Sequence, residues 1–280
     1  MKQLVIIILV FLISSLSANS QDKIHREEFG LKGNVKSVKE NSYKKVEKFG
    51  EIVKEKSRRV YFMRDFYYIF NKKGNIINKN EYTSDESDYH KYIFKYNRKG
   101  EVTTKKLEST IVISSMKNTV KFHTIYKYDN YGNIIEQVFY KSSNNSFLSK
   151  YTYIYNKKGN KIEQNYYDES IDKLDKKRKY KLDDKGNVIE ENYYESSGKL
   201  KYKYLSKYNE KGNKIEDQTF KPDGSLVYRG IFEYDNYNNI TWEEGYKIKY
   251  EYDINGNWIS KIEFNDNVEG HTIEREIVYF

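Results

Sequence analysis

Cysteine is absent from the 280-residue chain, proline occurs once and histidine only four times. The lack of thiols excludes disulfides, thiolate metal sites, cysteine nucleophiles and a lipid anchor on an N-terminal cysteine. The histidines are far apart in sequence, and none has the spacing of a metal-binding or nucleophile motif: His25, His90, His123 and His271. Acidic residues are abundant, but no pair is distinguished as the two carboxylates of a glycosidase. We therefore expect no cofactor, no metal site, no catalytic residue and no enzymatic activity.

Long apolar runs are also missing after the first 13 residues. The chain begins with Met1 and Lys2, continues with ten apolar residues (4–13) and then with small and polar residues up to Ser20. This layout is typical of a secretory signal peptide, so we expect residues 1–20 to be removed by cleavage after Ser20. The alternative is an uncleaved membrane anchor, although a helix needs ~20 residues to span a bilayer. No later segment is apolar enough to cross as a helix, so no transmembrane span is expected.

The remaining composition is charged and rich in tyrosine. Lysine and arginine number 50 against 41 acidic residues, for a net charge of +9, and the signs are interspersed. Such a surface stays solvated and mildly favours anionic partners such as acidic glycans. No nucleic-acid motif is present, so nucleic acid is not an expected partner. The 30 tyrosines favour pleated, half-exposed strands, whereas the scarcity of alanine disfavours helices.

One six-residue pattern recurs: an aromatic residue, Asp or Asn, two variable residues, Gly and Asn. The glycine slots at 159, 186, 212 and 238 follow one another at intervals of 27, 26 and 26 residues. A fixed period of this size marks a repeat architecture. Residues 29–34 form a degenerate first copy. The glycine slots of the regular copies are Gly74, Gly100, Gly132, Gly159, Gly186, Gly212, Asn238 and Gly256.

The pattern has a local physical explanation as a hairpin turn. Asp or Asn at its start bonds to the backbone two residues on and initiates a type I turn. The residue that rejoins the partner strand must then have a positive φ, which glycine adopts without steric cost. Asn238 supports this interpretation, because asparagine tolerates the left-handed region better than other non-glycine residues.

The flanking segments alternate as strands do. Tyr151, Tyr153 and Tyr155 fall on one face of a strand, and each period of about 26 residues contains two strands and two turns. We predict an all-β fold of tandem antiparallel β-hairpin repeats in residues 21–280, with a degenerate first unit (21–60) and regular repeats at about 61–265. The predicted sheet is a long twisted or spiralling meander, open rather than closed into a barrel. An outer-membrane barrel needs an apolar face on every strand, and Glu274 and Glu276 interrupt it in the last one.

The copies at 128–133 (Tyr-Asp-Asn-Tyr-Gly-Asn) and 252–257 (Tyr-Asp-Ile-Asn-Gly-Asn) resemble the YD repeat of the bacterial RHS family. Segments 197–200 and 223–226 are similar to MORN-like repeat variants. The resemblance implies an exported β spiral or shell associated with carbohydrate binding, adhesion or toxin encapsulation. Eight or nine copies are too few for a closed shell of that family, and no separate effector follows the repeats, so toxin delivery is not expected.

We therefore expect an exported, non-enzymatic binding or interaction scaffold in the periplasm, at the cell surface or outside the cell. Its expected partners are glycans or cell-envelope components, and exposed strand edges favour self-association. The candidate ligand contacts are Tyr151, Tyr153, Tyr202 and Tyr204, unless the tyrosine rows only pack the sheet. The turn acids are an alternative calcium site, which neighbouring Lys157 and Lys158 disfavour. Alternatives are a purely structural envelope protein, a fragment-like relative of RHS toxin-delivery proteins, or an enzyme with a buried ionisable cluster in residues 100–132.

Overall fold

The structure, a computed structural model, describes residues 25–56, 65–82, 89–113, 116–168, 173–243, 245–266 and 268–280. The expected signal peptide (1–20) lies outside these residues. One short 3₁₀ helix, η1 (Arg26–Phe29), precedes the strands in the described part of the chain. No helix among the described residues is long and apolar enough to cross a membrane.

Nineteen strands form one antiparallel sheet. They are β1 (Val35–Lys48), β2 (Glu51–Lys56), β3 (Asp65–Phe70), β4 (Ile76–Tyr82), β5 (Tyr89–Tyr96), β6 (Val102–Ile113), β7 (Met116–Tyr128), β8 (Ile134–Lys141), β9 (Ser146–Tyr155), β10 (Lys161–Asp168), β11 (Leu174–Leu182), β12 (Val188–Glu195), β13 (Leu200–Tyr208), β14 (Lys214–Phe220), β15 (Leu226–Tyr234), β16 (Ile240–Glu243), β17 (Tyr246–Tyr252), β18 (Trp258–Asn265) and β19 (Val268–Tyr279).

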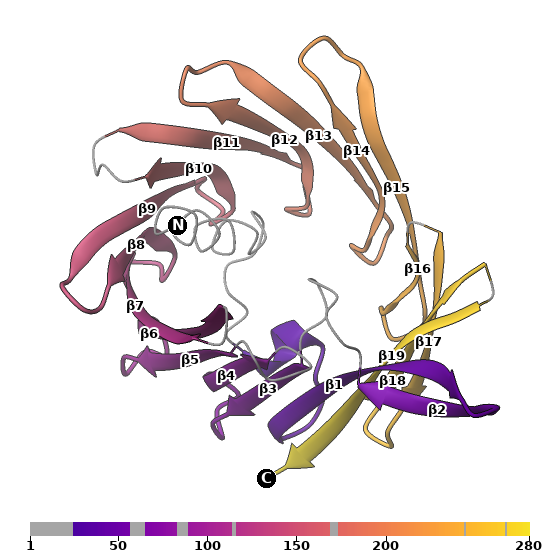
Figure 1. The fold of residues 1–280 in the computed structure, drawn as a ribbon. Coiled ribbons are helices and arrows are strands. Elements are labelled where there is room, and N and C mark those ends of the chain that lie inside the picture. Colours follow the sequence, from indigo (N-terminus) through magenta and orange to yellow (C-terminus); the bar gives the residue numbers. More distant parts are fainter. Residues whose placement is uncertain are drawn as a thin grey trace.

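The sheet closes into a barrel, so the prediction of an open meander is wrong. β1 pairs with β3 on one side and with β19 on the other, and eighteen strands, β1 and β3–β19, complete the ring (Figure 1). The β1–β19 register runs from the Val35–Tyr279 pair to the Lys44–His271 pair. β2 lies outside the ring and pairs with the end of β1.

The repeated pattern forms the hairpin turns along one rim of the barrel. In the copy at 183–187, the amide of Gly186 donates to the carbonyl of Asp183 at 3.1 Å, and the amide of Asp183 donates to Asn187 at 2.9 Å. Gly186 has a φ of 89° and Asn238 a φ of 66°. The other glycine slots of the pattern also have positive φ: Gly74, Gly100, Gly132, Gly159, Gly212 and Gly256.

The degenerate first copy closes this rim. Asn257, the last residue of the last copy, accepts from the Lys32 amide at 2.7 Å and donates to the Lys32 carbonyl at 3.0 Å. It also donates to the Tyr279 hydroxyl at 2.8 Å, and its side chain is almost completely buried. Between the residues that precede β1 and the end of β19, the Phe280 amide donates to the Asn34 carbonyl at 2.9 Å. The first and last copies are thus neighbours in space.

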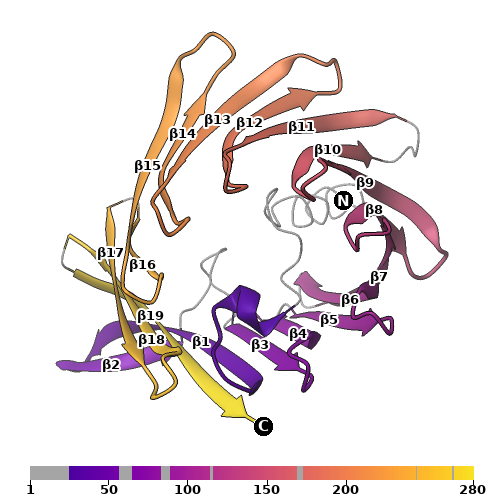
Figure 2. The ribbon, with the colours of Figure 1, turned by 180° about the vertical axis from the view of Figure 1, so that it is seen from behind.

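η1 identifies the inner face of the wall. Figures 1 and 2 show η1 inside the ring against β1 and β3, and its Phe29 ring lies 4.9 Å from that of Tyr68. The side of the sheet that carries Tyr68 therefore faces inward. Residues directly opposite one another on adjacent strands lie on the same face of the sheet, so the inner face can be followed from strand to strand around the ring. Val38 lies opposite Tyr68 on one side and opposite Ile277 on the other, so Ile277 also faces inward.

The apolar core lies on this inner face along β1 and β3–β8, and Phe29 of η1 and Leu31 of the loop after it pack into it. Tyrosine, phenylalanine and β-branched residues suit such a pleated, buried surface. Its buried members are Leu31, Val35, Val38, Tyr68, Phe70, Ile76, Tyr92, Phe94, Val102, Tyr126 and Ile134.

The outer face carries exposed lysines on strands around the whole ring: Lys39, Lys95, Lys106, Lys121, Lys127, Lys179, Lys181, Lys207, Lys247 and Lys249. A lysine at the lipid-facing midplane of a barrel costs about 2–4 kcal/mol. The charged side chains therefore did not exclude closure of the sheet into a barrel. Glu274, which we took as evidence against closure, lies on this outer face in the β1–β19 seam and pairs with Lys54 of β2.

Candidate functional site: an inner tyrosine patch

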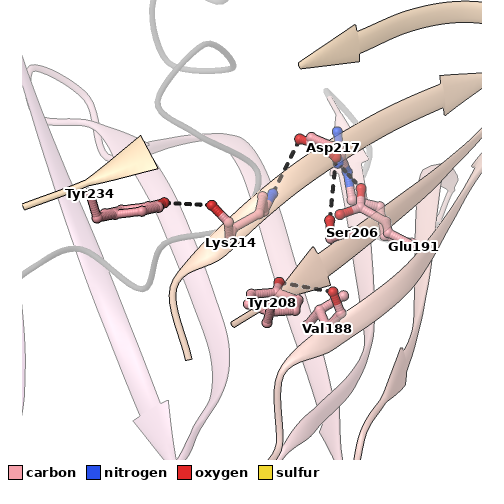
Figure 3. Close-up of polar contacts among 8 residues, drawn as sticks. Val188, Glu191, Ser206, Tyr208, Lys214, Asp217 and Tyr234 are labelled. Carbon is pink, nitrogen blue, oxygen red and sulfur yellow. Dashed lines mark hydrogen bonds and ion pairs between the residues drawn. The ribbon is translucent and has the colours of Figure 1, made fainter. Parts of the chain in front are cut away.

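The tyrosines of the inner face fall into two groups. In the first group, five tyrosines in the aromatic slot of the turn pattern donate their hydroxyl to the backbone carbonyl just after the preceding turn, at 2.5–2.9 Å. These pairs are Tyr96–Ile76, Tyr128–Val102, Tyr155–Ile134, Tyr208–Val188 and Tyr234–Lys214. Figure 3 shows the last two. Each of these five links joins a repeat to the one before it, so this group is structural.

The second group lies mid-strand and has uncommitted hydroxyls. Tyr151, Tyr193, Tyr202 and Tyr204 make no side-chain hydrogen bond within the part of the chain that the structure describes. All four are partly exposed. Tyr153 differs, because its hydroxyl donates to Gln137 Oε1 at 2.9 Å.

The candidate tyrosines come from two hairpins that the fold joins across β9–β13. Tyr151 lies opposite Tyr166 of β10, with ring centroids 4.8 Å apart. Further along the sheet, Tyr193 of β12 lies opposite Tyr202 of β13, and Tyr204 lies opposite Glu191. We call this surface the inner tyrosine patch; its members are Tyr151, Tyr153, Tyr166, Tyr180, Tyr193, Tyr202, Tyr204, Arg178 and Glu191.

An ion pair occupies the centre of the patch. Arg178 of β11 donates to Glu191 of β12, which is 4% exposed. The Arg178 guanidinium also lies over the Tyr193 ring, 4.9 Å from its centroid. A charge buried this deeply is stable only with a partner, so each group orients the other. The pair thereby gives the patch a fixed set of donors and acceptors between aromatic rings.

A second cation lies beside it. The Lys161 ammonium is 5.3 Å from the centroid of Tyr153 and 5.4 Å from that of Tyr180. Burial lowers the pKa of Lys161, while Glu191 opposes this shift. Burial likewise raises the pKa of the Tyr151 hydroxyl to about 12, against the effect of Arg178. At neutral pH that hydroxyl is protonated and can donate or accept a hydrogen bond.

Sequence reasoning placed Tyr151, Tyr153, Tyr202 and Tyr204 on the patch but missed its charged centre. Arg178 and Glu191 are ordinary members of charged runs in the sequence. The alternation of their strands could have placed both on the tyrosine face. Their pairing requires the register between β11 and β12, which the turn at 183–187 sets.

A row of buried polar residues crosses β4–β6 and bears on the enzyme alternative. Glu81, His90 and Ser109 lie directly opposite one another, with 5%, 6% and 0% exposure, and Lys105 is buried nearby. The Ser109 hydroxyl makes no hydrogen bond to His90 or to any other residue that the structure describes. A catalytic serine needs contact with its base and access for the substrate. Among the described residues, Ser109 shows neither feature.

The turn acids, the alternative calcium site, are engaged locally. Asp129 accepts from the Tyr131 and Asn133 amides and from Asn133 Nδ2, each at 2.9 Å. The hydrogen bonds from Asn133 lower the pKa of Asp129. No group of three or more metal-ligating side chains occurs among the described residues. The carboxylate therefore has a structural role in the turn.

No protein-family model and no curated protein matches the chain. Among solved structures, a porin-like protein from Bacteroides uniformis is similar at 11% identity and a TM-score of 0.46, over 89% of this chain and 99% of that one. A porin-like protein from Bacteroides vulgatus has 11% identity and a TM-score of 0.29, over 88% and 98%. The Tc holotoxin pore from Photorhabdus luminescens has 13% identity and a TM-score of 0.35, over 71% of this chain and 12% of that one.

Proposed function

We propose that the chain is an exported, non-enzymatic binding protein whose inner tyrosine patch holds a glycan of the cell envelope. The observation that carries this proposal is the presence of uncommitted tyrosine hydroxyls around the Arg178–Glu191 pair. Tyrosines that serve only the fold donate their hydroxyls to backbone carbonyls, as Tyr208 does to Val188. Those of the patch retain this capacity for a ligand.

The chemistry of the patch suits a sugar. An aromatic ring can stack on the apolar face of a pyranose, and the ring hydroxyls and the ion pair can bond to the sugar hydroxyls around it. Tyr193 and Tyr202 lie side by side across β12 and β13, which suits a chain of sugar rings better than a single small molecule.

The outward lysines support a barrel that works in water. Lys106, Lys179 and Lys249 lie near the middle of their strands, where a lipid-facing wall carries apolar side chains. A location in the periplasm, at the cell surface or outside the cell agrees with this exterior and with the signal peptide predicted from the sequence. The RHS-like turns are compatible with the same role in carbohydrate binding or adhesion.

The experiment is a glycan array and a panel of cell-wall fragments, with hits measured by calorimetry on the protein without residues 1–20. We expect Tyr202→Ala to weaken binding at least tenfold, because a tyrosine anchor contributes about 2 kcal/mol or more. Tyr131→Ala is the matched control, since this ring is 92% exposed on a turn outside the patch. Failure of every glycan to bind, or equal binding by Tyr202→Ala, would overturn the proposal.

The second candidate is a purely structural envelope protein. It is favoured by the repeated hydroxyl-to-carbonyl links, because they give the tyrosines a role in the fold that involves no ligand. In that case Tyr202→Ala would change the unfolding midpoint, and no ligand would distinguish the variant from the parent protein.

A further inference from the structure

One repeat of the barrel is short. Asn238 and Gly256 are 18 residues apart, against 26 for the preceding interval, and β16 has only four residues. As a result, β15 pairs with β16 only through Phe232, Glu233 and Tyr234. Residues 226–231 of β15 pair with β14 on one side and have no described strand on the other. Figure 1 shows the β14–β15 hairpin extending past β16.

Several large apolar side chains on this free edge and on neighbouring β16 and β17 are exposed. Val227 is 51% exposed, Ile231 42%, Trp242 37% and Tyr246 45%. A pocket of about 460 Å³ lies between them, lined by Tyr228, Arg229, Gly230, Ile231, Trp242 and Gly245. We call this surface the notch. Unpaired strand edges with exposed apolar side chains are sites of strand addition.

A second free edge projects from the opposite end of the chain. The end of β1 pairs with β2 in a hairpin that points away from the ring in both views (Figures 1 and 2). At its tip, the Phe49 side chain is fully exposed, and Ile52 is 73% exposed. No described strand pairs with the outer edge of β2. We call this element the outer hairpin.

Phe49 also occupies an unfavourable backbone conformation. Its φ is 54°, in the left-handed region, where a bulky side chain is strained and where Asn or Gly is usual. An exposed phenylalanine at this position adds nothing to the fold and makes the turn less favourable. A local conflict of this kind is characteristic of functional positions.

The two surfaces are complementary. The free edge of β15 has six residues, and β2 (Glu51–Lys56) also has six. At the notch, Lys247 lies opposite Trp242 and is exposed, whereas Glu51 is exposed on β2. Neither charge has an ion-pair partner among the described residues, so each can pair with the other in a complex.

We infer that the outer hairpin of one copy binds in the notch of a second copy, with β2 added to the edge of β15 and Phe49 in the pocket. Within one chain, the described part of β2 pairs with β1, and β15 pairs with β14 and β16. The contact joins two different surfaces, so it is head-to-tail and repeats from copy to copy. The barrel would therefore assemble into chains or rings of copies, with the inner tyrosine patch of each one left unchanged.

The test uses the full mature chain in sedimentation velocity over a wide range of concentration. The parent protein should form species larger than dimers as its concentration rises. Phe49→Asn should be monomeric and no less stable than the parent, because asparagine tolerates the left-handed turn. Val227→Lys should also be monomeric, because it places a charge at the open edge. Ile254→Ser is the matched control at another fully exposed site and should assemble as the parent does.

Mixing the two monomeric variants separates a lost interface from a lost fold. Val227→Lys retains an intact outer hairpin and Phe49→Asn an intact notch, so the mixture should form dimers and nothing larger. A parent that stays monomeric at all concentrations, variants that still assemble, or a mixture that stays monomeric would each overturn the inference.

Discussion

The link between Tyr208 and Val188 permits a quantitative test of why tyrosine recurs in the turn pattern. The Tyr208 hydroxyl donates to the Val188 carbonyl at 2.9 Å in a half-buried position (Figure 3). Tyr208→Phe removes this bond and leaves the ring in place. A hydrogen bond of this kind contributes about 1 kcal/mol net, so the free energy of unfolding should fall by about that amount.

The repeat at Leu182 allows the reverse experiment. Leucine replaces the aromatic residue there, so the Lys161 carbonyl, just after the preceding turn, has no tyrosine hydroxyl to accept from. Leu182→Tyr should supply the missing donor and raise the free energy of unfolding by about 0.5–1 kcal/mol. The two changes should therefore shift stability in opposite directions.

The assay is equilibrium unfolding in urea, compared through the midpoint at constant slope. Tyr202→Phe is the matched control, because it removes a hydroxyl with no hydrogen-bond partner among the described residues and should leave the midpoint unchanged. The reasoning would be refuted if Tyr208→Phe and Tyr202→Phe had the same effect, since the hydroxyl bond would then contribute nothing specific to the fold.

Two further predictions concern the barrel seam and the buried tyrosines. Arg275 of β19 donates to Glu40 of β1 at 2.7–2.8 Å and covers the Trp258 ring. Arg275→Met should therefore lower the free energy of unfolding by about 3–5 kcal/mol, and adding Glu40→Gln should recover part of this loss, because no buried carboxylate is then left without a partner. Equal stability of the single and double variants in urea would contradict this prediction. Burial raises the pKa of Tyr151 and Tyr155 from 10.0 to about 12, so their contribution to stability is complete below pH 10 and is lost as the pH rises towards 12. The unfolding midpoint should fall over that range together with the appearance of tyrosinate absorbance, and a midpoint that stays constant up to pH 12 would argue against the burial of these hydroxyls.

The local structure of the barrel could be predicted from sequence because each turn is determined by adjacent residues. Gly186 and Asn238 have positive φ for reasons contained in six residues of sequence. Alternation likewise placed Tyr151 and Tyr153 on one face, as the stacking of their rings requires. These features depend on short-range sterics and hydrogen bonds alone.

Closure could not be predicted in the same way. It rests on β1–β19 pairing and on the contact between Asn257 and Lys32, which are 225 residues apart. No local pattern specifies that the cumulative twist of eighteen strands brings the ends together. Glu274 appeared in the sequence only as an interruption of an apolar face, whereas the fold places it beside Lys54.

The charged centre of the inner tyrosine patch was missed for a related reason. Arg178 and Glu191 become partners only when β11 and β12 are in register. In the sequence they belong to charged segments in which most residues are solvated, such as Lys179 and Lys181. Only the three-dimensional arrangement distinguishes the paired arginine from its exposed neighbours.

The contact between β1 and β19 also affects how the molecule is made. In an open row of hairpins, the units can fold one after another from the first. In this ring, the sheet closes only when β19, the last strand, pairs with both β18 and β1. Before β19 pairs, β1 and β18 each have an unpaired edge to which a strand of another molecule can add. Loss of a dozen C-terminal residues would therefore leave two unpaired strand edges, and we expect such a truncated protein to aggregate.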